Sequence, residues 1–187
     1  MKNKILFIID AQYDFIEGGN LAVEGARKAM DNLVEYIGTH YKEYDHIILT
    51  VDWHPITHCS FKDNGGEWPI HCLQHSHGAA IYQPILDILN DLKVDYQILT
   101  KGCNEDREEY SVFKNMVSKS YLEAFAKETE FVDYAGLALN FCVKDSCIDG
   151  KKVFVGAKTR VLKDCTAAIG DASGTIKQLE ENNIEIV

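Results

Sequence analysis

Largely apolar runs of strand length alternate with amphipathic segments along the whole chain, and this alternation constrains the fold most. Such runs occupy residues 5–9, 46–51, 96–100, 131–137, 160–163 and 184–187. Continuous apolar runs are typical of strands that helices cover on both faces. Helical spacing fits residues 26–44, 84–92, 118–127, 143–155 and 171–182. The sequence therefore predicts a three-layer αβα fold with a central, mainly parallel sheet of Rossmann-like topology.

Two helices in this pattern contain residues that bear on the prediction. The segment at 118–127 offers Ser118 or Ser120 as its N-terminal cap. The segment at 143–155 contains Gly150, which costs a helix roughly 1 kcal/mol relative to alanine.

Length and charge restrict the classes of protein. With 187 residues, one domain spanning 1–187 is expected. The net charge of −10 argues against nucleic acid or an anionic membrane as a partner. The apolar run at 5–9 is too short for a signal peptide or a membrane span, so we expect a cytoplasmic protein. Its six cysteines include no CxxC pair, which favours thiols over disulfides.

Chemically active residues stand at the predicted strand ends. Asp10, Asp52 and Lys101 directly follow or end three strands, and Cys142 comes shortly after the fourth. In a parallel sheet these ends meet at one edge, where ligands bind. An acid, a cation and a thiol there would form a nucleophile with its base and its charge partner. Taken singly, Asp10 could be a turn cap, Lys101 a solvated charge and Cys142 a core residue.

The position of Cys142 supports the nucleophile interpretation. It falls at the junction of a buried strand and a helix, where unpaired backbone N–H groups stabilise negative charge. We therefore expect its thiol to ionise more easily than that of a free cysteine.

A loop at about 52–83 is rich in histidine, with five of the seven histidines of the chain, at positions 54, 58, 71, 75 and 77. Asp52 and His54 are two residues apart, so in an extended segment they point to the same side. His71 could complete a three-ligand site with open positions, as catalytic metals require. Such ligands suit zinc, iron or manganese. His58 and Glu67 are candidates for outer or fourth ligands.

A closed zinc site is the structural alternative for this loop. It would use Cys59 and Cys72 with the histidines, although their spacing fits no common zinc-finger pattern. A structural zinc module of this kind would unfold when the metal is removed.

Four stretches together resemble one family. They are residues 9–15 (Ile-Asp-Ala-Gln-Tyr-Asp-Phe) with 18–23 (Gly-Gly-Asn-Leu-Ala-Val); 52–55 (Asp-Trp-His-Pro) with 68–72 (Trp-Pro-Ile-His-Cys); 101–102 (Lys-Gly) with 110–113 (Tyr-Ser-Val-Phe); and the segment 137–144 around the cysteine. In this order they are similar to the nicotinamidase (pyrazinamidase) family of the isochorismatase-like cysteine hydrolases. Residues 139–141 (Leu-Asn-Phe) depart from the more usual Thr-Asp-Tyr.

The resemblance assigns roles to individual residues. It implies a catalytic triad of Asp10, Lys101 and Cys142, and metal ligands Asp52, His54 and His71. It implies a cis peptide bond between Leu137 and Ala138 that aims the N–H groups of Ala138 and Cys142 at an oxyanion. It further implies an aromatic substrate slot walled by Phe15, Trp68, Tyr110 and Phe141.

The implied activity is hydrolysis of nicotinamide to nicotinate and ammonia through a Cys142 thioester, a step of NAD salvage, with pyrazinamide as a further substrate. The implied cofactor is one divalent metal, zinc before iron or manganese. Three alternatives stay open: a related amidase acting on another small amide or carbamoyl compound, a non-catalytic metal-containing binder, and the structural zinc module. Assembly into a homo-oligomer also stays open.

Overall fold

The computed structural model describes residues 3–187, which form one six-stranded sheet in the order β3-β2-β1-β4-β5-β6. Every neighbouring pair of strands runs parallel. The strands are β1 (Asn3–Ile9), β2 (His46–Asp52), β3 (Tyr96–Lys101), β4 (Thr129–Leu137), β5 (Lys158–Ala167) and β6 (Glu185–Ile186). The predicted αβα fold is confirmed, with a sheet that is wholly rather than mainly parallel.

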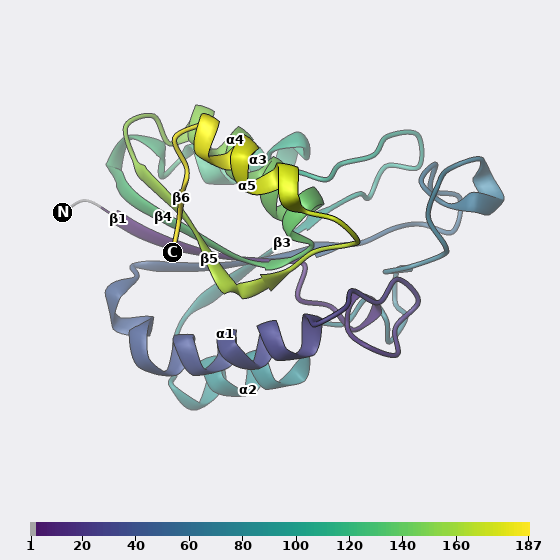
Figure 1. The fold of residues 1–187 in the computed structure, drawn as a ribbon, viewed down its shortest axis with the longest axis horizontal. Helices are drawn as coiled ribbons and strands as arrows, with labels where there is room; N and C mark the ends of the chain where they lie inside the picture. The colour runs from purple at the N-terminus through teal and green to yellow at the C-terminus, as the bar shows by residue number, and fades with distance from the viewer. Residues whose placement is uncertain (1–2) are drawn as a thin grey trace.

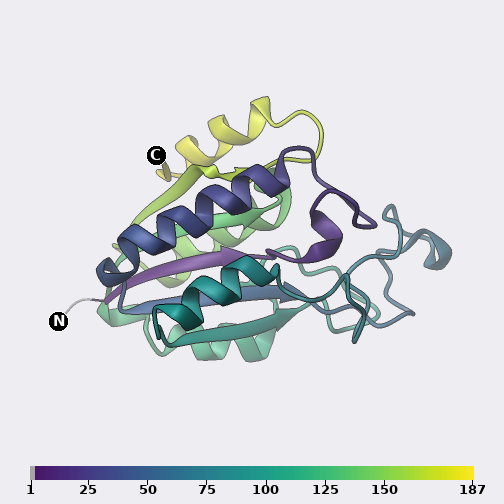
Figure 2. The same ribbon diagram turned by 90° about the horizontal axis from the view of Figure 1, so that it is seen from below.

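Helices cover both faces of this sheet (Figure 1). One layer holds α1 (Ala26–His40) and α2 (Gln83–Asp91), which lie side by side in Figure 2. The other layer holds α3 (Met116–Glu123), α4 (Lys144–Val153) and α5 (Ser173–Glu181). Short 3-10 turns occupy Tyr13–Phe15, Tyr41–Glu43, Lys62–Asn64, Val112–Lys114 and Ala126–Glu128. Among the described residues, no helix is both long enough and apolar enough to cross a membrane.

The central strand β1 shows why the chain folds into three layers. Leu6 and Ile8 pack into the apolar cluster beneath α1 and α2, whereas Ile5, Phe7 and Ile9 pack into the cluster on the opposite face. All five side chains are completely buried. Each such burial contributes about 1.5–3 kcal/mol, so a strand without polar alternation is stable only between two helical layers.

The topology fixes where the loops gather. From β1 the chain proceeds outward to β2 and β3 on one side, and then crosses to β4, β5 and β6 on the other. The direction of winding therefore reverses between β1 and β4, and the loops following these strands diverge there. Such a switch point at the carboxyl ends of the strands is where open α/β sheets bind ligands. The long loop between β2 and α2 extends from this same edge (Figure 1).

The structure corrects two predicted boundaries. Helix α3 begins at Met116, and its cap is Asn115, whose side chain accepts a hydrogen bond from the Ser118 N–H at 3.2 Å. The hydroxyl of Ser118 instead donates to the Thr100 carbonyl in β3. Because this tertiary contact occupies the Ser118 side chain, Ser118 does not cap the helix. Strand β5 extends to Ala167, because a register shift in its pairing with β4 allows it to continue beyond the predicted 160–163.

The helix after β4 is also divided differently from its prediction. A π-helical turn, Leu139–Val143, precedes α4 and carries Cys142. Helix α4 then ends at Val153, two residues before the predicted end. Gly150 lies inside it because the helix passes very close to the sheet: a Cβ at this position would lie 2.0 Å from the Tyr134 hydroxyl and 3.0 Å from a Phe113 ring carbon.

We expect Gly150→Ala to lower the free energy of unfolding by about 1–3 kcal/mol, although alanine is the better helix former. The Tyr134 ring cannot move aside easily, because it is fully buried and stacks on Phe7 with the ring centroids 4.9 Å apart. Gly38→Ala in α1 is the control, since its Cβ would meet only Ile88 Cδ1 at 3.9 Å. In that control the free energy of unfolding should rise by about 0.5–1 kcal/mol. Equal stabilisation of both variants in urea denaturation would contradict this account.

Candidate active site

The predicted acid, cation and thiol come together at the carboxyl edge of the sheet. Lys101, the last residue of β3, places its Nζ 2.8 Å from Asp10 Oδ2, 2.5 Å from Asp52 Oδ1 and 3.3 Å from Cys142 Sγ. These four side chains are buried. The convergence at one edge that the strand ends predicted is therefore what the structure shows.

Asp10 occupies a strained junction directly after β1, with a φ of 45°. Its Oδ1 accepts a hydrogen bond from the Thr50 hydroxyl at 2.7 Å. Its Oδ2 lies at ion-pair distance from Lys101, but among the described residues no donor is aligned with it for a hydrogen bond. One oxygen of Asp10 lies within 4.8 Å of the Cys142 sulfur. Asp10 can therefore accept a proton from the thiol.

Burial and charge set the proton affinities of this cluster. Burial opposes the charge on Asp52, but Lys101 and then His54 hold the pKa of that carboxyl well below its usual range. Burial raises the pKa of Asp10, and the Asp52 charge adds to the effect against the pull of Lys101. Although burial disfavours the Lys101 ammonium, Asp10 and Asp52 raise the pKa of Lys101 well above its usual value. Lys101 and Asp52 thus stay charged, and Asp10 is the group suited to exchange a proton.

The expectation of an easily ionised thiol is not met. Burial raises the pKa of Cys142 well above that of a free cysteine, and the nearby Lys101 offsets this only in part. Desolvation of the buried sulfur outweighs the favourable charge at the helix terminus. The thiol consequently needs a base in contact with the site.

A second buried group consists of Asp52, His54 and His71, with one ligand atom of each within 4.8 Å of the others. His54 Nδ1 lies 2.9 Å from the Gly102 carbonyl, and His71 Nδ1 lies 2.8 Å from the Pro69 carbonyl. A carbonyl only accepts, so each Nδ1 carries a proton, and in the neutral ring Nε2 is then the nitrogen with a free lone pair. This tautomer suits metal ligation, and such outer contacts are what orient ligating histidines. The three residues fit one divalent metal with open positions.

The two candidates for an additional ligand differ in position. His58 is completely buried, its ring centroid lies 4.0 Å from that of His54, and its Nε2 has no hydrogen-bond partner among the described residues. Burial lowers the pKa of His58 to about 4, which keeps the ring neutral. Glu67 is exposed at the surface. Only His58 therefore lies in the interior beside the metal group.

The structural zinc alternative finds no support in the described residues. Their groups of closely spaced metal-binding side chains include neither Cys59 nor Cys72. Cys72 is buried, with its backbone N–H donating to Asp14 Oδ2 at 2.7 Å. Hydrogen bonds between side chains and the backbone organise this region instead. Gln12, for example, holds the backbone of Asp52 through two hydrogen bonds of 2.8 Å.

A slot leads to Cys142 and has the predicted aromatic walls, Phe15, Trp68, Tyr110 and Phe141. It encloses about 320 Å³ of empty space including its mouth. Trp68 Nε1 donates to the Tyr110 hydroxyl at 3.0 Å, and Phe141 meets the Trp68 ring edge-on, with centroids 5.2 Å apart. Burial raises the pKa of Tyr110 to about 12, so this wall stays neutral. The slot has fixed, uncharged aromatic faces.

Three further residues line the slot that sequence reasoning did not select, Leu21, Glu108 and Ile169. Leu21 lies within residues 18–23, a stretch that resembles the family, so the resemblance could have indicated it. Glu108 and Ile169 lie in loops without periodicity, and nothing in their local sequence indicated which way they would point. Ala138 also lines the slot, and its peptide bond with Leu137 is cis, as the resemblance implied.

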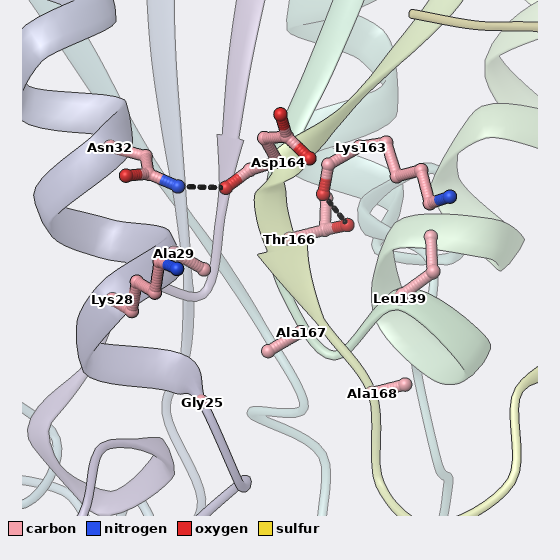
Figure 3. Close-up of a pocket in the computed structure, with 10 residues that line it drawn as sticks. All are labelled: Gly25, Lys28, Ala29, Asn32, Leu139, Lys163, Asp164, Thr166, Ala167 and Ala168. Carbon is pink, nitrogen blue, oxygen red and sulfur yellow. Dashed lines mark hydrogen bonds between the residues drawn. The ribbon is translucent and has the colours of Figure 1, made fainter.

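A separate hollow between α1 and β5 has a different character (Figure 3). It encloses about 650 Å³ by the same measure. Its walls contain neither cysteine nor histidine and include small residues such as Gly25, Ala29 and Ala167. The slot, not this hollow, is the candidate active site.

Comparison with known proteins agrees with this geometry. The family described as "Isochorismatase domain" matches residues 4–181. The chain belongs to the isochorismatase family. Within the family it is 32% identical to a nicotinamidase/pyrazinamidase of Mycobacterium tuberculosis, over 95% of this chain and 93% of that protein.

Two solved structures have the same fold. A pyrazinamidase of Pyrococcus horikoshii in complex with zinc superposes with a TM-score of 0.84 at 29% identity, covering 99% of this chain and 98% of the other. The protein PnC1 of L. infantum in complex with nicotinate superposes with a TM-score of 0.86 at 28% identity, covering 100% and 92%. The protein is therefore an isochorismatase-family hydrolase that closely resembles nicotinamidases.

The contact between Gly102 and His54 gives a test of the metal group. A Cβ on Gly102, which has a φ of +63°, would lie 2.3 Å from His54 Cε1. We expect Gly102→Ala to displace the ring and weaken metal binding about 10- to 100-fold, as loss of outer contacts does elsewhere. The measurement is metal retained per protein during titration with a competing chelator.

Gly156→Ala is the matched control, because its φ of +87° imposes backbone strain but nothing lies within 4 Å of its Cβ. It should retain metal like the wild type. Equal metal affinity in the two variants would remove His54 from the ligand set. Circular dichroism of both variants checks that the fold persists.

Proposed function

We propose that this protein hydrolyses nicotinamide to nicotinate and ammonia, using Cys142 as nucleophile. One observation carries the proposal: a single aromatic slot is lined both by Cys142 and by Asp52 and His71 of the metal group. Flat, uncharged faces of this kind suit a heteroaromatic ring, with its carboxamide at the sulfur. The names of the relatives, nicotinamidase and pyrazinamidase, support the same class of substrate.

Proton transfer would begin the reaction. Asp10 takes the thiol proton of Cys142 through the oxygen that lacks an aligned donor. The Lys101 ammonium, 3.3 Å from the sulfur, stabilises the thiolate at this buried position. The raised pKa of Asp10 suits it to hold that proton and release it later in the cycle.

The thiolate then attacks the carboxamide carbon, forming a C–S bond. In this proposal the N–H groups of Ala138 and Cys142 stabilise the oxyanion. As the C–N bond breaks, protonated Asp10 delivers its proton and ammonia leaves. A water molecule, deprotonated by Asp10, hydrolyses the thioester to nicotinate and restores the thiol.

The metal group would act in the same slot, through Asp52 and His71 in its lining. Asp52, His54 and His71 would hold one divalent ion, which supplies positive charge and Lewis acidity there. Zinc is the metal in the P. horikoshii structure, while the ligands also suit iron or manganese. Trp68, Tyr110 and Phe141 would orient the ring.

We expect Cys142→Ala to lower nicotinamide turnover by at least about 1,000-fold, because the covalent step disappears. The measurement is ammonia release by the metal-loaded protein, alongside its metal content, which should not change. Cys165→Ala, also a buried cysteine but outside the slot, should keep wild-type activity. Near wild-type turnover by the Cys142 variant would refute the nucleophile assignment.

Chelation separates the catalytic metal from a structural one. Treatment with a chelator should abolish ammonia release while circular dichroism shows the fold largely retained, and added metal should restore turnover. If turnover does not change on chelation, the assignment of Cys142 as nucleophile stands and a catalytic role of the metal group is refuted. Unfolding on chelation would favour the structural zinc module.

The substrate is tested separately from the chemistry. Saturable turnover of nicotinamide supports the proposal, and pyrazinamide is a second expected substrate. If neither amide is hydrolysed but a carbamoyl compound is, the protein is a related amidase with a different substrate. No hydrolysis of any of these would favour a non-catalytic binder.

A further inference from the structure

A side-chain amide bridges the turn that carries Cys142 to the loop after β5. Asn140 Nδ2 donates to the Ile169 carbonyl at 2.8 Å, and the Ile169 N–H donates back to Asn140 Oδ1 at 3.1 Å. The two residues are 29 positions apart in the chain. One side chain thus satisfies both backbone groups of Ile169, as a neighbouring strand would.

In the loop at 168–172, the Ile169 side chain also packs against the apolar cluster beneath α1 and α2, but its backbone lies outside every strand and helix of the described residues. Strand β5 pairs with β4 only as far as Ala167, and α5 begins at Ser173. Among the backbone-to-backbone bonds of the described loops, none involves Ile169. The Asn140 amide is therefore the polar contact that fixes this residue.

Ile169 is a wall of the substrate slot, whereas Asn140 is not. The Ile169 side chain lines the slot together with Cys142, Phe141 and Leu21. Any displacement of the loop would open the slot on this side without moving the thiol. Asn140 can accordingly affect the substrate through Ile169 and does not need to touch it.

We propose that Asn140 is a positioning residue that holds Ile169 against the substrate ring and thereby sets the affinity for the amide. The inference rests on the proposed function, since it concerns the same slot. The two bonds seen in this chain need an amide: a carboxylate could accept from the Ile169 N–H but would repel its carbonyl. The bridge needs a donor and an acceptor on one short side chain.

Steady-state kinetics of the metal-loaded protein with nicotinamide tests this role. Asn140→Asp, nearly identical in shape, should raise KM about fivefold to tenfold and leave kcat within about twofold, because one bond of the pair is replaced by repulsion. Asn140→Ala should do the same or more. A fall in kcat at constant KM would overturn the proposal, because it would show that Asn140 acts on the nucleophile turn.

A double-variant comparison shows whether Asn140 acts through Ile169. Ile169→Ala should itself raise KM, and adding Asn140→Ala to it should raise KM no further. Independent, multiplying effects would overturn the proposal.

Asn32 provides a matched control (Figure 3). Its Nδ2 donates to the Asp164 carbonyl of β5 at 2.7 Å, a bond of the same kind to the same stretch of chain, but outside the slot. Asn32→Ala should leave KM unchanged. An equal rise in KM would show that any loosening of β5 suffices, and would overturn a specific role for Asn140.

Hydrogen exchange separates this inference from the proposed function. The Ile169 amide should exchange slowly in the wild type and at least about tenfold faster in Asn140→Ala, whatever the protein hydrolyses. Unchanged exchange would refute the bridge even if nicotinamide is the substrate. A wild type that exchanges as expected but does not hydrolyse nicotinamide would refute the substrate, and with it the role in nicotinamide affinity.

Discussion

The site depends on one buried ammonium. Lys101 is completely inaccessible, and a buried charge is tolerated only when it is paired. Its partners Asp10 and Asp52 come from the ends of two other strands, so the ion group ties β1, β2 and β3 together at their carboxyl ends. Removing one partner of such a group typically costs about 3–5 kcal/mol. The pairing that stabilises this edge also holds a positive charge beside the Cys142 sulfur.

Asp52 connects the two halves of the site. Its Oδ1 faces Lys101 at 2.5 Å, and its Oδ2 lies 3.7 Å from His54 Nε2. A cation held by the histidines would therefore share this carboxylate with the ammonium. The charge at the proposed metal position and the charge that stabilises a thiolate are coupled through one side chain. The acid, the thiol and the metal group, which the parallel sheet brings to one edge, are thus linked electrostatically.

Much of this arrangement was predictable, because it follows from periodicity and from the parallel sheet. Apolar runs identified the strands, and a parallel sheet places all their carboxyl ends on one side. The strand ends alone therefore predict that Asp10, Asp52 and Lys101 lie together. The resemblance to the family implied the aromatic walls of the slot. Short-range signals failed where a tertiary contact competed: Asn115, not Ser118, caps α3, because Ser118 bonds to β3.

By itself, then, the sequence determined the order and type of the elements and the residues at the strand ends, because these depend on local spacing. The tertiary structure alone decided the proton affinities and the loop contacts. Burial raises the pKa of Cys142, and no local pattern reports desolvation. The closeness of Tyr134 explains Gly150, and the slot acquires Ile169 through a bridge from Asn140. Such features depend on residues far apart in the chain, whose distances only the packed fold specifies.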